Sequence, residues 1–180
     1  MLRKIKRIFK KKSYNYTKKF KTYSLAENYL DKKNLYFDKR YTKKFFGPEN
    51  VESLERFYAA SIIAALLNKK RLNILDIGGG NNPIFSYIKK STGISTYCTV
   101  LETKKFVNII SKKVPSKFKK YIKYISDIDK IKKKIHIVCF ISSIQYLKDY
   151  EKIILKFKKN KPEYFIITRT FFHKKKENYY

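Results

Sequence analysis

The sequence contains little glycine, proline or acidic residue. Only 5 of its 180 residues are glycine and 4 are proline, which excludes collagen-like and low-complexity chains. Hydrophobic residues make up 43% of the chain and aromatic residues 17%, so the chain is not disordered throughout. Its length suits one domain with a modest core of its own.

Cysteines and long apolar runs are also scarce. The two cysteines, Cys98 and Cys139, lie far apart in apolar segments, with no CxxC motif or histidine cluster beside them. This pattern predicts buried reduced thiols in a cytoplasmic protein and no metal site. The longest apolar stretch, at residues 61–67, is too short to span a bilayer. Residues 1–12 lack the apolar segment of a secretory signal.

The shortage of acid leaves a formal net charge of +30, with 14 acidic and 44 basic residues, of which 38 are lysine. A basic protein of this kind is a candidate for binding nucleic acid. However, lysine together with abundant isoleucine and tyrosine is typical of AT-rich coding sequence, and phosphate-binding surfaces more often use arginine. Only residues 1–21 concentrate the charge, with ten basic and no acidic residues. Elsewhere the spread favours a solvated lysine surface.

Two regions precede the main domain. In the basic tail, 1–21, helical spacing of four apolar residues allows peripheral contact of residues 1–12 with the inner face of an anionic membrane, or else a frayed tail. Residues 22–70 are expected to form N-terminal helices. Ser24 to Glu27 fits a capping box, and Pro48 suits the first turn of a helix that runs to about Asn68.

From residue 71 onward, short apolar runs alternate with helical patterns. We expect five strands, at 72–77, 95–101, 121–125, 135–141 and 164–168, and a helix after most of them. This alternation predicts an α/β domain over 71–172 with a mostly parallel sheet, followed by a polar tail at 173–180. Asn82 is predicted to cap the helix that follows the first strand, with Pro83 at its first position.

The chemistry is expected at the carboxyl ends of the strands, where ligands bind in such sheets. Asp76 is the last residue but one of the first strand, and the glycine turn Gly78, Gly79 and Gly80 follows that strand. Glu102 follows the second strand and can accept both ribose hydroxyls of a nucleoside. Asp127 follows the third strand and can accept from an adenine amino group, although Asp129 competes with it. Asp76 could equally be a structural acid that caps the turn.

These segments resemble class I S-adenosylmethionine-dependent methyltransferases. Asp76-x-Gly78-x-Gly80 is similar to their first motif, Glu102 to their ribose-binding acid, and Asp127-Ile128 to their adenine-side acid and its neighbour. The runs LDIGGG, SSIQYL and TRTFF are most similar to a methyltransferase family of bacterial surface-polysaccharide gene clusters, over about residues 50–172. The resemblance implies a Rossmann-like class I methyltransferase fold with the first strand central. It also implies S-adenosylmethionine as cofactor.

The chain departs from the family at three points. Asn82 stands where the general pattern has a third glycine. The family run Asp-Arg-Thr-Pro-Phe has become Thr168-Arg169-Thr170-Phe171-Phe172. The last two strands of the fold have no counterpart, because 173–180 is too short and polar. We therefore expect a truncated member with weak activity, with its fifth strand at a sheet edge and Phe165, Phe171 and Phe172 unusually exposed.

The resemblance also implies the roles of further residues. Cofactor binding is assigned to nine residues: Asp76, Gly78, Gly79, Gly80, Asn82, Glu102, Asp127, Ile128 and Ser142. Candidates near the acceptor are Ser143, Gln145, Tyr146 and Arg169, although the first three could be a helix cap and core residues. The implied acceptor is a hydroxyl of a glycan or another small molecule. Two alternatives stay open: an RNA methyltransferase, and a non-catalytic protein that binds nucleic acid or anionic membrane.

Overall fold

The computed structural model describes residues 21–32, 54–66, 71–147 and 149–169. Several predicted features lie outside these residues. They are the basic tail up to residue 20, the start of the helix predicted from Pro48, Phe171 and Phe172, and the polar tail. The chain divides into two compact units, and the helix α2 belongs to a different unit from every other described element.

Helix α2 spans Tyr23–Lys32 and begins before the predicted capping residue. Ser24 therefore lies inside the helix, and the capping box expected there is wrong. The side chain of Thr22 takes the role instead, because its Oγ1 accepts the Leu25 N–H at 3.3 Å. This is the bond that an N-cap threonine makes to the third helical residue.

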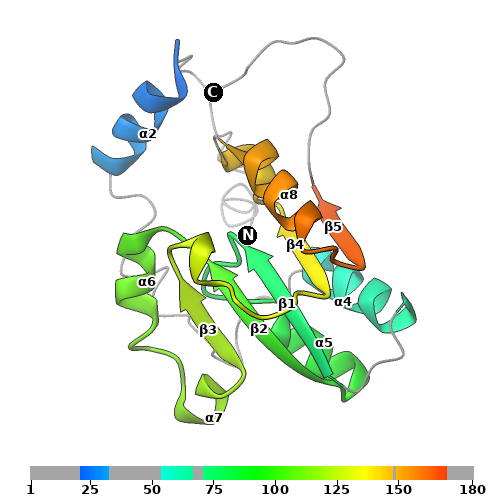
Figure 1. Ribbon diagram of the computed structural model, residues 1–180. Coiled ribbons are helices and arrows are strands. Elements are labelled where there is room, and N and C mark those ends of the chain that lie inside the picture. The colour runs from blue at the N-terminus through cyan, green and yellow to red at the C-terminus, as the bar shows by residue number, and fades with distance from the viewer. Residues whose placement is uncertain (1–20, 33–53, 67–70, 148, 170–180) are drawn as a thin grey trace, which may run out of the picture. The chain divides into compact units, whose positions relative to one another are not determined.

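Within the described residues, five parallel strands form a sheet in the order β3-β2-β1-β4-β5 (Figure 1). The strand bounds are β1 Arg71–Ile77, β2 Ser95–Leu101, β3 Ile122–Ile125, β4 Ile137–Ile141 and β5 Tyr164–Thr168. The predicted Rossmann-like order, with the first strand in the middle, is confirmed. The register pairs Leu72 with Thr96 and Asp76 with Val100, so β1 and β2 end side by side.

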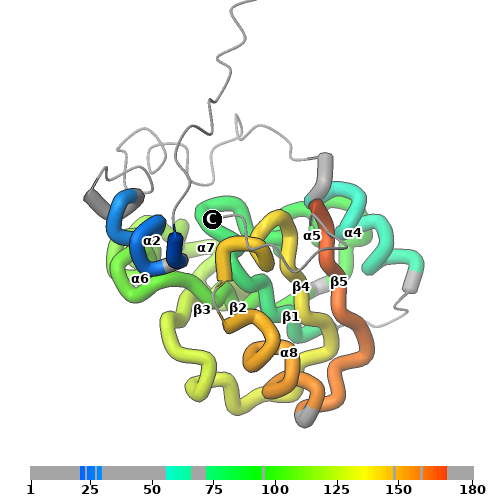
Figure 2. Tube along the Cα trace, turned by 90° about the horizontal axis from the view of Figure 1, so that it is seen from above, coloured from blue at the N-terminus to red at the C-terminus, as the bar shows by residue number. Residues whose placement is uncertain are grey.

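Helices cover both faces of the sheet (Figure 2). On one face α4 (Leu54–Leu66), α5 (Phe85–Thr92), α6 (Lys104–Ile110) and the short α7 (Ser116–Lys119) enclose a core that includes Ile63, Ile74, Ile88 and Cys98. On the other face, α8 (Tyr150–Lys159) packs Phe157 against Leu75 and Phe140. Cys98 and Cys139 are buried free thiols, as predicted.

Helix α5 begins three residues after the predicted cap. Its N-cap is Ile84, and the Asn82 side chain instead donates to the Tyr87 hydroxyl at 2.7 Å. The prediction for Asn82 as N-cap is therefore wrong. The physical reason is the carboxylate of Asp76, whose Oδ2 accepts the Ile84 N–H at 2.9 Å and so takes the place of a local cap.

β5 lies at the edge of the sheet that the described residues form, as predicted. Its alternate side chains Phe165 and Ile167 are 37% and 38% exposed, which is unusual for large apolar residues. The expected exposure of Phe165 is therefore confirmed. None of the described helices is long and apolar enough to cross a membrane.

Candidate functional site

The glycine turn lies directly after β1, at the carboxyl edge of the sheet. Gly78 and Gly80 have φ angles of 69° and 60°, which L-residues with side chains rarely adopt. The Gly78 N–H donates to the Leu101 carbonyl at 2.9 Å, which ties the start of the turn to the end of β2. The backbone of the turn is therefore fixed by the neighbouring strand.

Asp76 is completely buried and holds two elements against the turn. Besides capping α5, its Oδ2 accepts from Arg56 Nη1 of α4 at 3.0 Å. Arg56 Nη2 donates to the Gly79 carbonyl at 3.2 Å. The contacts of Asp76 therefore support its interpretation as a structural acid that holds the turn. Arg56 was missed in the sequence, although a charged residue on the apolar stripe of Ala59, Ala60 and Ile63 is a signal for a buried partner.

Close packing explains why the turn contains glycine at two positions. A Cβ on Gly79 would lie 2.6 Å from Asp76 Cγ, and one on Gly78 would lie 2.6 Å from Ser143 Cβ. Both distances are far below van der Waals contact, and both neighbours are buried. Gly79 is therefore required by the Asp76 carboxylate, and Gly78 by β4 as well as by its φ angle.

Glu102 and Tyr124 hold the peptide groups of Gly80. The Gly80 N–H donates to Glu102 Oε1 at 2.9 Å, and Tyr124 OH donates to the Gly80 carbonyl at 2.8 Å. Glu102 Oε2 accepts the Thr103 N–H at 3.2 Å. Burial raises the pKa of Glu102, and the Gly80 and Thr103 N–H groups oppose that shift. Burial also raises the pKa of Tyr124, so its hydroxyl stays protonated. Sequence analysis did not identify Tyr124.

The residues after β4 and β5 lie at the same edge of the sheet. Ser143 is buried, and its Oγ donates to the Ile77 carbonyl at 2.5 Å, so it links β4 to β1. Ser142 has a φ of 57° and donates its N–H to the Thr168 carbonyl. Gln145 Nε2 donates to the Ser142 carbonyl, and both Gln145 and Tyr146 are exposed. Arg169 has a φ of 52°.

Asp127 and Ile128 are not joined to the turn by any hydrogen bond between described residues. Asp127 Oδ1 accepts the Asp129 N–H at 2.9 Å and caps the short helix η2 (Ile128–Lys130). Ile128 lines an open cavity of about 610 Å³ between η2 and α8, together with Leu155 and Phe157. Glu102 is therefore hydrogen-bonded to the turn, whereas Asp127, which was predicted to converge on the same cleft, makes no hydrogen bond to the turn among the described residues.

The arrangement differs from a phosphate-binding loop. Such loops present free N–H groups and the N-terminus of a helix to the phosphate. Here Glu102 accepts the Gly80 N–H, Leu101 accepts that of Gly78, and Asp76 lies at the N-terminus of α5. Two carboxylates of the protein therefore occupy the positions that would attract a phosphate.

Comparison with known proteins gives structural likeness only. No family model and no curated protein matches the chain. Among solved structures, it is similar to one from Methanococcus maripaludis that is provisionally assigned as an S-adenosyl-L-methionine-dependent methyltransferase, at 16% identity and a TM-score of 0.46. It is also similar to the plantazolicin methyltransferase BpumL in complex with SAH, at 16% identity and a TM-score of 0.33.

The coverage of these matches is partial. The first match covers 78% of this chain and the second 69%. In return, this chain spans 60% of the first protein and 46% of the second. Because the TM-scores are below 0.5, the description of the fold rests on the strand order and register found above.

Proposed function

We propose that the protein is an S-adenosylmethionine-dependent methyltransferase whose acceptor is a hydroxyl group of a glycan or another small molecule. The hydrogen bond between Glu102 Oε1 and the Gly80 N–H carries this proposal. It places a carboxylate, with lone pairs left for ribose hydroxyls, beside the glycine turn. A nucleoside without phosphate fits such a turn, whereas a dinucleotide or a nucleoside triphosphate would be repelled by it.

The residues of the chain would serve mainly to bind and align. S-adenosylmethionine supplies an already activated methyl group, so the protein has to position the acceptor oxygen in line with it and exclude water. Gly78, Gly79 and Gly80 keep the turn low enough for close approach of the cofactor. Asn82, Asp127, Ile128 and Ser142 remain candidates for its outer contacts.

The acceptor side is assigned to residues after β4 and β5. Gln145 and Tyr146 are exposed at the carboxyl edge, where we expect the acceptor, and Arg169 is our candidate for binding an anionic one. Ser142 and Arg169 have left-handed backbone, a strained conformation that often accompanies functional sites. Ser143 is better assigned to positioning, because its hydroxyl is committed to the Ile77 carbonyl.

Calorimetry with the full chain tests the cofactor. We expect binding of S-adenosylmethionine and S-adenosylhomocysteine, and none of ATP at the same concentration. Glu102→Ala should weaken binding by about 1.5–3 kcal/mol, the typical value of a hydrogen bond to a charged group. Glu151→Ala is the matched control, since Glu151 is an exposed acid of α8 whose carboxylate accepts from Tyr150 and is assigned to no site. Binding of ATP in place of S-adenosylhomocysteine would refute the proposal.

Transfer to the acceptor is tested separately, with methyl-labelled cofactor and pools of small glycans or of RNA. Label in the glycan fraction, lost in Glu102→Ala, is the expected result. Label in RNA alone would make the protein an RNA methyltransferase. Cofactor binding without label in either pool would refute the acceptor proposal and leave the cofactor proposal standing.

A further inference from the structure

A second surface lies toward the amino ends of β2 and β3, away from Glu102. Its aromatic centre is the pair Tyr97 and Tyr121, whose ring centroids are 6.1 Å apart. Lysine ammonium groups lie over both rings: Lys133 at 5.6 Å from the centroid of Tyr97, and Lys89 and Lys120 at 5.1 Å and 4.9 Å from that of Tyr121. With Lys123, these six residues form what we call the lysine–tyrosine face.

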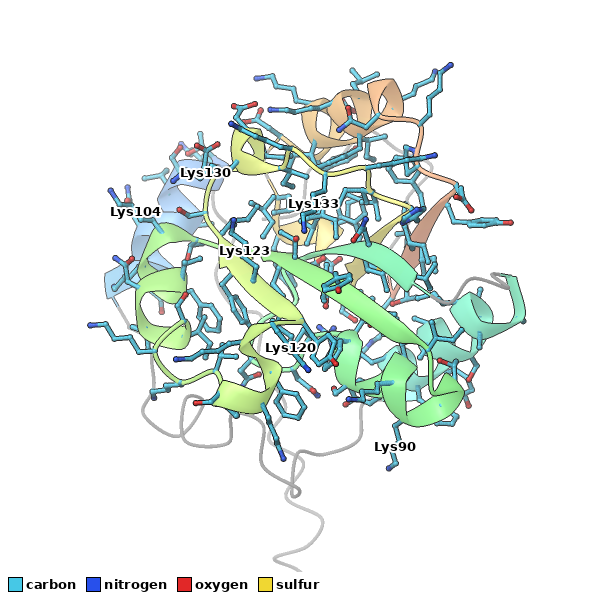
Figure 3. The ribbon with its side chains drawn as sticks, turned by 60° about the horizontal axis from the view of Figure 1, so that its bottom comes forward. Lys90, Lys104, Lys120, Lys123, Lys130 and Lys133 are labelled. Atoms are coloured by element: carbon cyan, nitrogen blue, oxygen red, sulfur yellow. The ribbon has the colours of Figure 1, made fainter. Side chains whose placement is uncertain are left out.

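The lysine–tyrosine face is open because the β3–β4 connection contains no α-helix. Only η2 forms there, and α8 packs against side chains of β1 and β4 such as Leu75 and Phe140. Among the described residues, no helix covers β2 and β3 in the view of Figure 3. Tyr97 is consequently 36% exposed. Lys123 is also exposed and pairs in register with Thr99, which places Tyr97, Thr99 and Lys123 on one side of the sheet.

The charge of this region is of one sign. Residues 103–126 contain eight lysines and no acidic residue, and Lys132, Lys133 and Lys134 follow consecutively before β4. Figure 3 shows Lys120, Lys123 and Lys133 near the centre of the view, with Lys90, Lys104 and Lys130 around them. The acids closest in sequence, Glu102, Asp127 and Asp129, lie past the opposite ends of the strands. A polyanion approaching here meets lysines without compensating carboxylates.

We propose that the lysine–tyrosine face binds single-stranded nucleic acid, with a base stacked on the exposed ring of Tyr97 and phosphates bound by Lys89, Lys120, Lys123 and Lys133. The half-buried Tyr121 supports Tyr97 from the side, because its own ring stacks on Phe85 at a centroid distance of 5.4 Å. Aromatic rings interleaved with lysines are how sequence-tolerant single-strand binders work. Exposed cation–π contacts are weak, so a base can replace the Lys133 ammonium over the Tyr97 ring while the lysine moves to the phosphate. A membrane surface fits less well, because it would need protruding apolar side chains on an amphipathic helix. This proposal is independent of methyl transfer.

The test is fluorescence anisotropy of the full chain with a labelled 12-nucleotide poly-U RNA and the corresponding poly-T DNA, at two salt concentrations. Tyr97→Leu keeps the apolar body of the side chain and removes its π face, and we expect at least fivefold weaker binding. Tyr97→Phe should bind as the wild type does. Lys123→Gln with Lys133→Gln should weaken binding and lower the slope of log affinity against log salt by about 1.4 in total.

The matched control is Lys158→Gln with Lys161→Gln, which removes the same charge from exposed positions at the end of α8 and in the loop after it. Circular dichroism checks that each variant folds. Equal losses of affinity in the two double variants would mean that binding depends only on the net charge, and this would overturn the proposal. Wild-type affinity of Tyr97→Leu would overturn it as well. Anionic vesicles provide the last arm. If the variants of the face lose vesicle binding but keep oligonucleotide binding, the surface is a membrane contact and the proposal is wrong.

Discussion

The two ends of the sheet use charge in opposite ways. At the carboxyl ends, Asp76 and Arg56 are buried and Glu102 is half-buried, and each is bound to the glycine turn or to the residues that support it. Toward the amino ends of β2 and β3, Lys120, Lys123 and Lys133 are exposed, and the ammonium groups of Lys120 and Lys133 lie over the rings of Tyr121 and Tyr97. Fixed charges shape a small site, whereas exposed charges of one sign attract an extended polyanion.

The largest effect on stability is expected at Arg56, in the buried ion pair with Asp76. Arg56→Met should lower the free energy of unfolding by about 3–5 kcal/mol, because it leaves the buried Asp76 carboxylate without its ion pair. Among the described residues, Asp76 Oδ1 already lacks a hydrogen-bond partner, so nothing there can compensate. Urea denaturation measures the loss, and Arg56→Met with Asp76→Asn should recover part of it. A loss below 1 kcal/mol would show that the turn does not depend on this pair.

Two glycine substitutions compare the packed turn with an open position elsewhere in the fold. Gly79→Ala should cost about 2 kcal/mol, because its Cβ would overlap the Asp76 carboxylate. Gly93→Ala, at a φ of 66° in open space, should cost about 1 kcal/mol from backbone strain alone. Only the first should also weaken cofactor binding. Thermal unfolding and calorimetry of both variants test this, and equal losses of affinity would contradict it.

The charge on Glu102 predicts a pH dependence of cofactor binding. Burial raises the pKa of Glu102 above 4.5, the ordinary value. If, as proposed, ionised Glu102 accepts the ribose hydroxyls, affinity should be full above the raised pKa and fall about tenfold for each pH unit below it. The free energy of unfolding depends on pH in the opposite direction. Glu102 stabilises the fold at low pH, and this contribution is lost as the pH rises through the raised pKa. Calorimetry from pH 8 to pH 5 should show no such fall for Glu102→Gln.

A smaller effect is expected at Tyr124. Tyr124→Phe removes one hydrogen bond to the Gly80 carbonyl and should cost about 1 kcal/mol of stability. Because the N–H of the same residue, Gly80, donates to Glu102, loss of this contact should weaken cofactor binding as well, without changing its pH dependence. Denaturant unfolding and calorimetry measure the two effects. A pH profile altered as in Glu102→Gln would mean that the two residues act as one.

The smallest effect on stability is expected on the lysine–tyrosine face. Lys123→Gln with Lys133→Gln should change the free energy of unfolding by less than about 0.5 kcal/mol and leave cofactor affinity unchanged. Both residues are exposed and make no ion pair with described residues. A loss comparable to that of Gly79→Ala would show that the two ends of the sheet are coupled, and the comparison would then fail.

The sequence sufficed for the parts of the fold that depend on local pattern. Alternating apolar runs located the strands to within about two residues, and the glycine turn indicated that β1 is central. Glu102 could be predicted to face the turn because parallel strands of similar length end together. That inference needs only the order of β1 and β2 and their register.

Contacts between residues far apart in the chain could not be predicted from local sequence patterns. Asn82 has the local features of a helix cap, but Asp76 takes that role from the end of β1. Arg56 and Tyr124 reach the turn from 23 and 44 positions away in the chain. The sequence showed lysines spread along the chain. The pairing of β2 with β3 brings Tyr97 beside Tyr121, and Lys89 of α5 and Lys133 of the loop before β4 reach these rings from elsewhere in the chain.

The most direct test of the account is nuclear magnetic resonance of the full chain labelled with ¹⁵N only at glycine. The chain has 5 glycines, so the spectrum contains five backbone signals, and Gly93 serves as an internal control far from the turn in sequence. On addition of S-adenosylhomocysteine, the account predicts shifts of the Gly78, Gly79 and Gly80 signals, an unchanged Gly93 signal, and loss of these shifts in Glu102→Ala. Unchanged signals from all three turn glycines at saturating ligand, or shifts that persist in Glu102→Ala, would contradict it.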